Sequence, residues 1–134
     1  MKATGEFTVK EWNENKLSGG SGLLSVYRVS AIFASGGGID GTFSVEYTML
    51  YKNGEAGGSA SEVRYTGILC FEGTVNGKNG RFAMEDSGVY ANGVPASSLN
   101  IIGYSGEGGF SGISGSGKYY SDSGKMIMEL ELEF

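Results

Sequence analysis

The amino-acid sequence predicts an all-β protein folded as a closed antiparallel barrel of about eight strands. Apolar and polar residues alternate along most of the chain, as they do in strands that bury one face. Among 134 residues there are 25 glycines and 1 proline, which favours strands with turns, bulges and bends. The connections are too short for crossover helices, and closing the sheet removes its exposed edges.

The first half of the chain contains four predicted strands. In chain order they are EFTVKEW (6–12), LLSVYRVSAIFA (23–34), TFSVEYTMLY (42–51) and EVRYTGILCFEGTV (62–75). The polar stretch NENKLSGGSG (13–22) is predicted to be a loop. Asn53-Gly54 is predicted to be a tight turn, because both residues tolerate positive φ.

The second half contains four more predicted strands. They are RFAMEDSGVY (81–90), SLNIIGY (98–104), GGFSGISGSGKYY (108–120) and KMIMELELEF (125–134). NGKNG (76–80) is predicted to close a hairpin, and ANGVPAS (91–97) is predicted to be a surface loop. In the last strand Met128, Leu130, Leu132 and Phe134 alternate with glutamates, which is typical of a sheet with one buried and one solvated face.

Two segments share a spacing that suggests repeated hairpins. YTGILCFEG begins at Tyr65 and YSGEGGFSG begins at Tyr104, with tyrosine, two glycines and phenylalanine at matching places. We expect both segments to be strands of the barrel wall. Two copies are too few for a repeat architecture, so a single domain over residues 1–134 is expected.

The composition excludes several classes of function. A net charge of -5 argues against nucleic-acid binding, which needs a basic surface. The chain has no histidine and only one cysteine, Cys70, so neither a metal site nor a Ser-His relay is expected. Cys70 is predicted to be a small buried residue. The glycine-rich stretch ending at Lys118 resembles a phosphate-binding loop, but Tyr119 replaces the Ser or Thr and a strand follows instead of a helix. No cofactor is expected.

The N-terminal segment lacks the apolar core of a signal peptide, and no apolar run approaches the length that spans a membrane. We therefore expect a soluble cytoplasmic protein with no membrane partner.

Aromatic residues dominate the side of the strands that is predicted to face inward. They are Phe43, Tyr47, Tyr51, Tyr65, Phe71, Phe82 and Phe110. The simpler interpretation is a filled barrel core. The alternative is a cavity for a small molecule, because inward tyrosines supply an apolar wall with a few polar groups. Tyr47, Tyr65 and Phe71 are the candidate ligand-binding residues from this set.

Two carboxylates are candidate catalytic residues. Glu11 is in register with Phe7 and Val9, and Asp86 is in register with Phe82 and Met84. If they face inward, loss of hydration raises their pKa values and either could accept a proton. The alternative is that each lies hydrated near the barrel mouth.

Three motifs together resemble those of an uncharacterised bacterial family, a domain of unknown function whose barrel is similar to that of allene oxide cyclase and the dirigent proteins. They are GEFTVKEW near the start, GTVNGKNGRFAMEDSG in the middle and SGEGGFSGISGSG near the end. The resemblance implies an allene-oxide-cyclase-like barrel that self-associates. It implies no agreed reaction, and cyclase activity is not carried over because fold does not fix function.

The chain departs from the family's pattern at two places. Relatives often hold a histidine where this chain has Asp86. The family's Ser-Gly-Thr-Gly matches residues 105–108, where Glu107 replaces the threonine, and this match makes Ser105 a further ligand-binding candidate.

The leading functional prediction is a barrel that holds a small apolar molecule in its interior. One alternative is an isomerase or cyclase that uses Asp86 or Glu11 as acid or base. The other is a structural module whose outer wall, including Ile68 and Ile127, builds a homo-oligomer.

Overall fold

The computed structural model describes residues 1–19, 24–52 and 62–134, which form nine strands and one short 3-10 helix. The elements are β1 (Lys2–Gly19), β2 (Leu24–Gly37), β3 (Ile39–Lys52), β4 (Glu62–Val75), β5 (Lys78–Ala91), β6 (Val94–Ile101), η1 (Gly103–Ser105), β7 (Glu107–Gly108), β8 (Ser114–Asp122) and β9 (Lys125–Glu133). Within these ranges no helix has the length and apolar character needed to cross a membrane.

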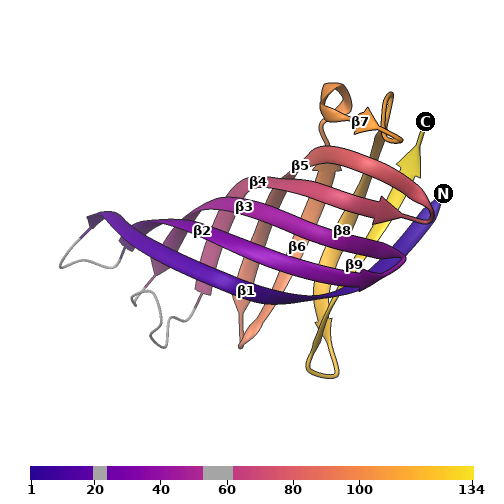
Figure 1. The fold of residues 1–134 in the computed structure, drawn as a ribbon. Coiled ribbons are helices and arrows are strands. Elements are labelled where there is room, and N and C mark those ends of the chain that lie inside the picture. The colour runs from indigo at the N-terminus through magenta and orange to yellow at the C-terminus, as the bar shows by residue number, and fades with distance from the viewer. Residues whose placement is uncertain (20–23, 53–61) are drawn as a thin grey trace.

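Eight of the strands form one closed antiparallel barrel, which confirms the predicted fold class. Each strand pairs with the next in the order β4-β3-β2-β1-β9-β8-β6-β5, and β4 pairs with β5 to close the ring. Figure 1 shows the long strands β1 to β4 crossing β6, β8 and β9 at a steep angle. The short β7 lies outside the ring and pairs only with Gly80 and Arg81 of β5.

Tight hairpins join several neighbouring strands, and the one between β4 and β5 lies in the predicted NGKNG segment. Asn76-Gly77 and Asn92-Gly93 have positive φ at both residues, as a two-residue turn that matches the strand twist requires. Ser123-Gly124 does the same between β8 and β9. The predicted Asn53-Gly54 turn lies outside the described residues.

Two segments predicted to be loops are strands. Residues 13–19 continue β1 and pair with β2, so polar composition alone was a poor guide there. Val94–Ile101 forms β6, although residues 91–97 were predicted to be a surface loop. Pro95 is the second residue of this strand and pairs with Tyr90, a place near a strand end where proline is tolerated.

The prediction that the segments beginning at Tyr65 and Tyr104 are both strands of the barrel wall is wrong. The first lies in β4, but the second lies in the segment 102–113, which we call the cap. The cap comprises η1, β7 and the turns around them, and Tyr104 within it is 95% exposed. Figure 1 shows the cap beyond the end of the barrel that lies opposite the β5–β6 and β8–β9 turns.

The capped end of the barrel is solid. Phe43, Phe71, Phe82 and Phe110 are buried there, with neighbouring ring centroids 4.8–5.1 Å apart. Phe110 comes from the cap, so the cap completes this part of the core. All seven aromatic residues predicted to face inward are buried.

Two residues of the predicted strands, Phe134 and Cys70, are exposed although they were predicted to be buried. Met128, Leu130 and Leu132 of β9 are buried, but Phe134 lies beyond the strand, is 53% exposed and packs under the Lys78 ammonium. Cys70 is exposed and not buried as predicted, because its inward neighbours Leu69 and Phe71 leave it on the outer face.

Candidate functional site

The other half of the barrel encloses a cavity of about 860 Å³. It opens at the end where the β5–β6 and β8–β9 turns lie, since Gly93 and Gly124 are part of its lining. The aromatic residues around it are Phe7, Trp12, Phe33, Tyr47, Tyr51, Tyr65, Tyr90 and Tyr119. The lining that the described residues supply includes no side chain with a formal charge.

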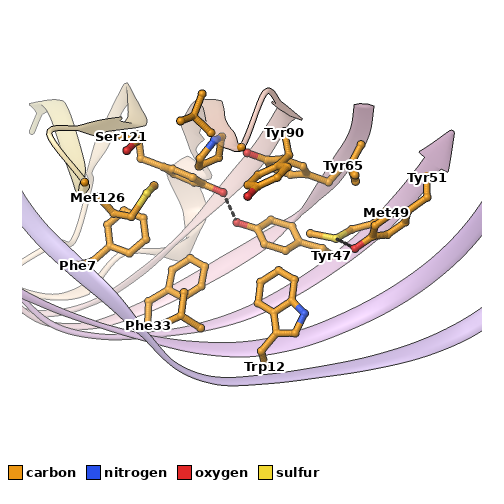
Figure 2. A pocket seen from close by; sticks show the side chains of 17 residues that line it. Phe7, Trp12, Phe33, Tyr47, Met49, Tyr51, Tyr65, Tyr90, Ser121 and Met126 are labelled. Carbon is orange, nitrogen blue, oxygen red and sulfur yellow. Dashed lines mark hydrogen bonds between the residues drawn. The ribbon is translucent and has the colours of Figure 1, made fainter. Parts of the chain in front are cut away.

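A bulge in β1 decides which residues of that strand face the cavity. The pairing with β2 shifts by one residue between Val9 and Glu11, so the side chains beyond Lys10 exchange faces. Trp12, which the uninterrupted alternation of 6–12 places on the face opposite Phe7, therefore lines the cavity (Figure 2). Glu11 does not face inward, which was the condition for its catalytic role: it is exposed, as in the hydrated alternative, and lines a groove on the outer wall with Ser30.

The hydroxyl groups of Tyr47, Tyr65 and Tyr119 form what we call the cavity floor, and Asp86 lies beside it without lining the cavity. Its side chain is fully buried, as predicted for an inward carboxylate. The Tyr47 hydroxyl donates a hydrogen bond to Asp86 Oδ2 at 2.6 Å and lies 2.7 Å from the Tyr119 hydroxyl. Because Tyr47 has one hydrogen, Tyr119 donates to Tyr47 while Asp86 is ionised. In Figure 2 a dashed line marks the hydrogen bond between the hydroxyl of Tyr47 and that of Tyr119.

All three groups have raised pKa values, but only Asp86 titrates near neutral pH. Burial raises the pKa of Asp86 from its ordinary 3.8 to about 6, although the hydroxyls of Tyr47, Ser97 and Tyr119 favour the charged form and oppose the rise. Burial also raises the pKa values of Tyr47 and Tyr119, and neighbouring negative charge adds to the rise. Both tyrosines therefore stay neutral in the range where Asp86 titrates.

A second hydroxyl pair lies beside this chain. The Tyr65 and Ser97 hydroxyls are hydrogen-bonded at 2.5 Å. Gly88 makes room for them, because a Cβ there would lie 2.6 Å from the Tyr65 hydroxyl and 2.7 Å from the Ser97 hydroxyl. Gly67 likewise makes room for the Tyr47 ring, whose Cδ1 would lie 2.7 Å from an added Cβ.

The predicted ligand-binding residues divide between the two ends of the barrel. Tyr47 and Tyr65 line the cavity. Phe71 lies in the solid core of the capped end and does not line it. Ser105 lies in η1 of the cap, where its hydroxyl accepts from the Ala83 N–H at 2.8 Å and donates to the Ile102 carbonyl at 2.5 Å. The structure thus places Ser105 as a tie between cap and barrel, away from the cavity.

Sequence reasoning missed three residues of the site. Ser97 was missed because its segment was predicted to be a loop, and Trp12 because a bulge has no sequence signature here. Tyr119 could have been found from the alternation in β8. Gly115, Gly117 and Tyr119 are two residues apart, so they share one face of the strand, and the two glycines leave room on that face.

The fold and the site define a small up-and-down β-barrel that is solid at one end and hollow at the other. The chain belongs to the DUF3224 family, whose description is a protein of unknown function and whose profile matches residues 3–134. This confirms the predicted membership of an uncharacterised family.

A solved structure from the same family shares this fold. A protein of unknown function from the DUF3224 family of Shewanella oneidensis MR-1 is similar with a TM-score of 0.82 and 19% sequence identity, covering 100% of this chain and 97% of that chain. No curated protein matches the chain. The likeness to allene oxide cyclase stays a prediction.

Proposed function

We propose that this protein binds a small, neutral and mostly apolar molecule in its barrel. The observation that carries the proposal is the cavity of about 860 Å³ with aromatic walls and a polar floor. Its volume lies in the range of small-molecule sites, which combine apolar walls with a few polar groups that orient the ligand. The lining described above is uncharged, and an ionic ligand would leave its own charge unpaired there.

The polar groups of the site lie together on the floor. The hydroxyls of Tyr47, Tyr65 and Tyr119 lie close together. Phe7 and Phe33, which also line the cavity, stack on each other with their ring centroids 5.0 Å apart. A ligand with an apolar body and one polar end matches this distribution. Its apolar body would pack against the tyrosine rings and methionine side chains of the cavity wall, and its polar end would form hydrogen bonds with the hydroxyls.

Filling the cavity from the wall tests the proposal. Met49 lines the cavity on β3, and the neighbouring Thr48 is exposed on the outer face. The probe is 2-ethylnaphthalene, an uncharged hydrocarbon that the cavity volume accommodates. We expect it to raise the melting temperature of the wild type in a concentration-dependent way. Native mass spectrometry should show one molecule bound.

The matched variants separate the cavity from the outer surface. Met49→Trp should weaken binding of the probe at least about tenfold by occupying its space, whereas Thr48→Trp should leave it unchanged. Binding that both variants retain equally would place the probe on the outer surface and contradict the proposal.

A second candidate function is acid–base catalysis of an isomerase or cyclase type. The observation that favours it is the hydrogen-bonded chain from Asp86 through Tyr47 to Tyr119, a path along which a proton could reach a substrate bound on the floor. For any substrate that is turned over, Asp86→Asn should abolish turnover and keep binding. Full turnover in that variant would exclude Asp86 as the acid or base.

A further inference from the structure

We propose that the chain Asp86–Tyr47–Tyr119 selects the ligand's polar group by reversing its own direction: a carbonyl finds a donor only when Asp86 is protonated, whereas a hydroxyl, which can donate or accept, finds a partner in both states. This inference rests on the proposed function and deepens it. It concerns the contact between the ligand's polar end and the Tyr119 hydroxyl, whereas the test of the proposed function concerns the apolar body of the ligand.

The direction of the chain is fixed by its hydrogen count. Each tyrosine has one hydroxyl hydrogen, and the distances of 2.6 Å and 2.7 Å leave both contacts as true hydrogen bonds. With Asp86 ionised, Tyr47 donates to Asp86 and Tyr119 donates to Tyr47. The oxygen of Tyr119 then offers only a lone pair to the cavity, and a ligand hydroxyl can donate to it.

Protonation reverses every bond of the chain. Asp86 Oδ1 is buried and has no hydrogen-bond partner among the described residues, so a proton on Oδ1 would have no acceptor. The proton belongs on Oδ2, where it points at Tyr47. Tyr47 then donates to Tyr119, and the hydrogen of Tyr119 is free to point into the cavity. A ketone or aldehyde oxygen is the partner that accepts it.

Asp86 is the group whose protonation changes the direction of the chain, because its ionisable neighbours do not titrate in the same pH range. The ionisable side chains that face it are Tyr47 on β3, Tyr65 on β4 and Tyr119 on β8, and β6 contributes the neutral Ser97. Burial raises the pKa values of all three tyrosines, so none ionises where Asp86 does. No lysine or arginine appears among the buried residues of the described chain.

Three naphthalenes with one skeleton test the inference. They are 2-acetylnaphthalene, which carries a ketone, 1-(2-naphthyl)ethanol, which carries a hydroxyl, and 2-ethylnaphthalene, which carries neither. Calorimetry gives their dissociation constants at about pH 5 and about pH 8, on either side of the Asp86 transition. We expect the ratio of ketone to alcohol affinity to fall about fivefold to tenfold from the lower to the higher pH, and the hydrocarbon to bind equally at both.

Single-hydroxyl variants identify the groups involved. Tyr119→Phe should make the ketone-to-alcohol ratio independent of pH, and so should Asp86→Asn. Tyr90→Phe is the matched control: Tyr90 lines the cavity but takes no part in the chain, so it should keep the wild-type pH dependence. If Asp86→Asn fails to fold, proton uptake by the wild type replaces it: ketone binding near the Asp86 pKa should take up protons, and hydrocarbon binding should not.

The outcomes separate the two proposals. Hydrocarbon binding with a ketone-to-alcohol ratio that does not change with pH would overturn the inference and leave the proposed function standing. Binding of none of the three probes would overturn both. A pH-dependent ratio that survives in Tyr119→Phe would place the selecting group elsewhere and overturn the inference.

Discussion

The two ends of the barrel are built from the same strands but have opposite interiors. On β3 and β4, Phe43 and Phe71 face inward at the capped end, and Tyr47, Tyr51 and Tyr65 face inward toward the open end. On these two strands the phenylalanines pack into a solid core, whereas the tyrosines line a cavity and share hydrogen bonds on its floor. The same inward register of β3 and β4 therefore builds a core at one end and a cavity wall at the other.

Truncating the solid end should produce the largest loss of stability. Phe71→Ala removes a fully buried ring that contacts Phe43 and Phe82, and should lower the free energy of unfolding by about 3–5 kcal/mol. Tyr90→Ala at the cavity mouth, where the side chain is 44% exposed, should cost less than about 1 kcal/mol. Urea denaturation measures both, and equal losses would contradict the division into a solid and a hollow end.

The buried carboxylate should make the hollow end sensitive to pH. Asp86 has a raised pKa in the folded protein, so the fold binds its proton more tightly than the unfolded chain does. The stability of the wild type relative to Asp86→Asn should therefore fall as pH rises from about 4 to about 7, by about 3 kcal/mol in total.

Urea denaturation of both proteins across this pH range measures the difference, since titrating groups common to both cancel. A difference that stays constant would show that Asp86 titrates normally, and one that shifts toward the wild type at the higher pH would show that folding lowers its pKa.

A glycine that makes room for the cavity floor should resist substitution. In Gly67→Ala the new Cβ would collide with the Glu46 carbonyl oxygen and press on the Tyr47 ring, which should cost about 1–3 kcal/mol. Gly36→Ala is the matched control on β2, because a Cβ there meets nothing within 4 Å. Thermal unfolding measures both, and a neutral Gly67→Ala would mean that the floor is loosely packed.

The tie between cap and barrel should give the smallest effect. Ser105→Ala removes the hydrogen bonds with Ala83 and Ile102 and should lower stability by about 1 kcal/mol. Because Ser105 lies away from the cavity, binding of 2-ethylnaphthalene should not change. Weakened binding in this variant would restore Ser105 as a ligand-binding residue.

Much of the barrel could be predicted from local patterns, because alternation fixes which residues of a strand face inward. It placed Tyr47 and Tyr65 inside and Asp86 in their register, and the NGKNG segment located the hairpin between β4 and β5. Alternation says nothing about how far along the barrel the interior is filled, which is why Phe71 was grouped with Tyr65 although they lie at opposite ends.

The errors have a different origin, because each depends on contacts between distant segments. The bulge near Lys10 is a matter of pairing with β2, and it moved Glu11 outward and Trp12 inward. The cap at 102–113 resembles a strand by composition, but Phe110 reaches its partners only in the closed barrel. Self-association, localisation and the identity of the ligand stay predictions.

The cap closes one end of the barrel, and this would govern how a bound ligand is exchanged. Because Phe110 and Ile113 are buried against the core, a ligand of the proposed kind would enter and leave on the side of the β5–β6 turn. Exchange would then be sequential: the first ligand would have to leave before a second could enter, and a competitor could not speed up its departure. Residence time, measured by chasing a bound probe with excess competitor, should therefore be independent of competitor concentration.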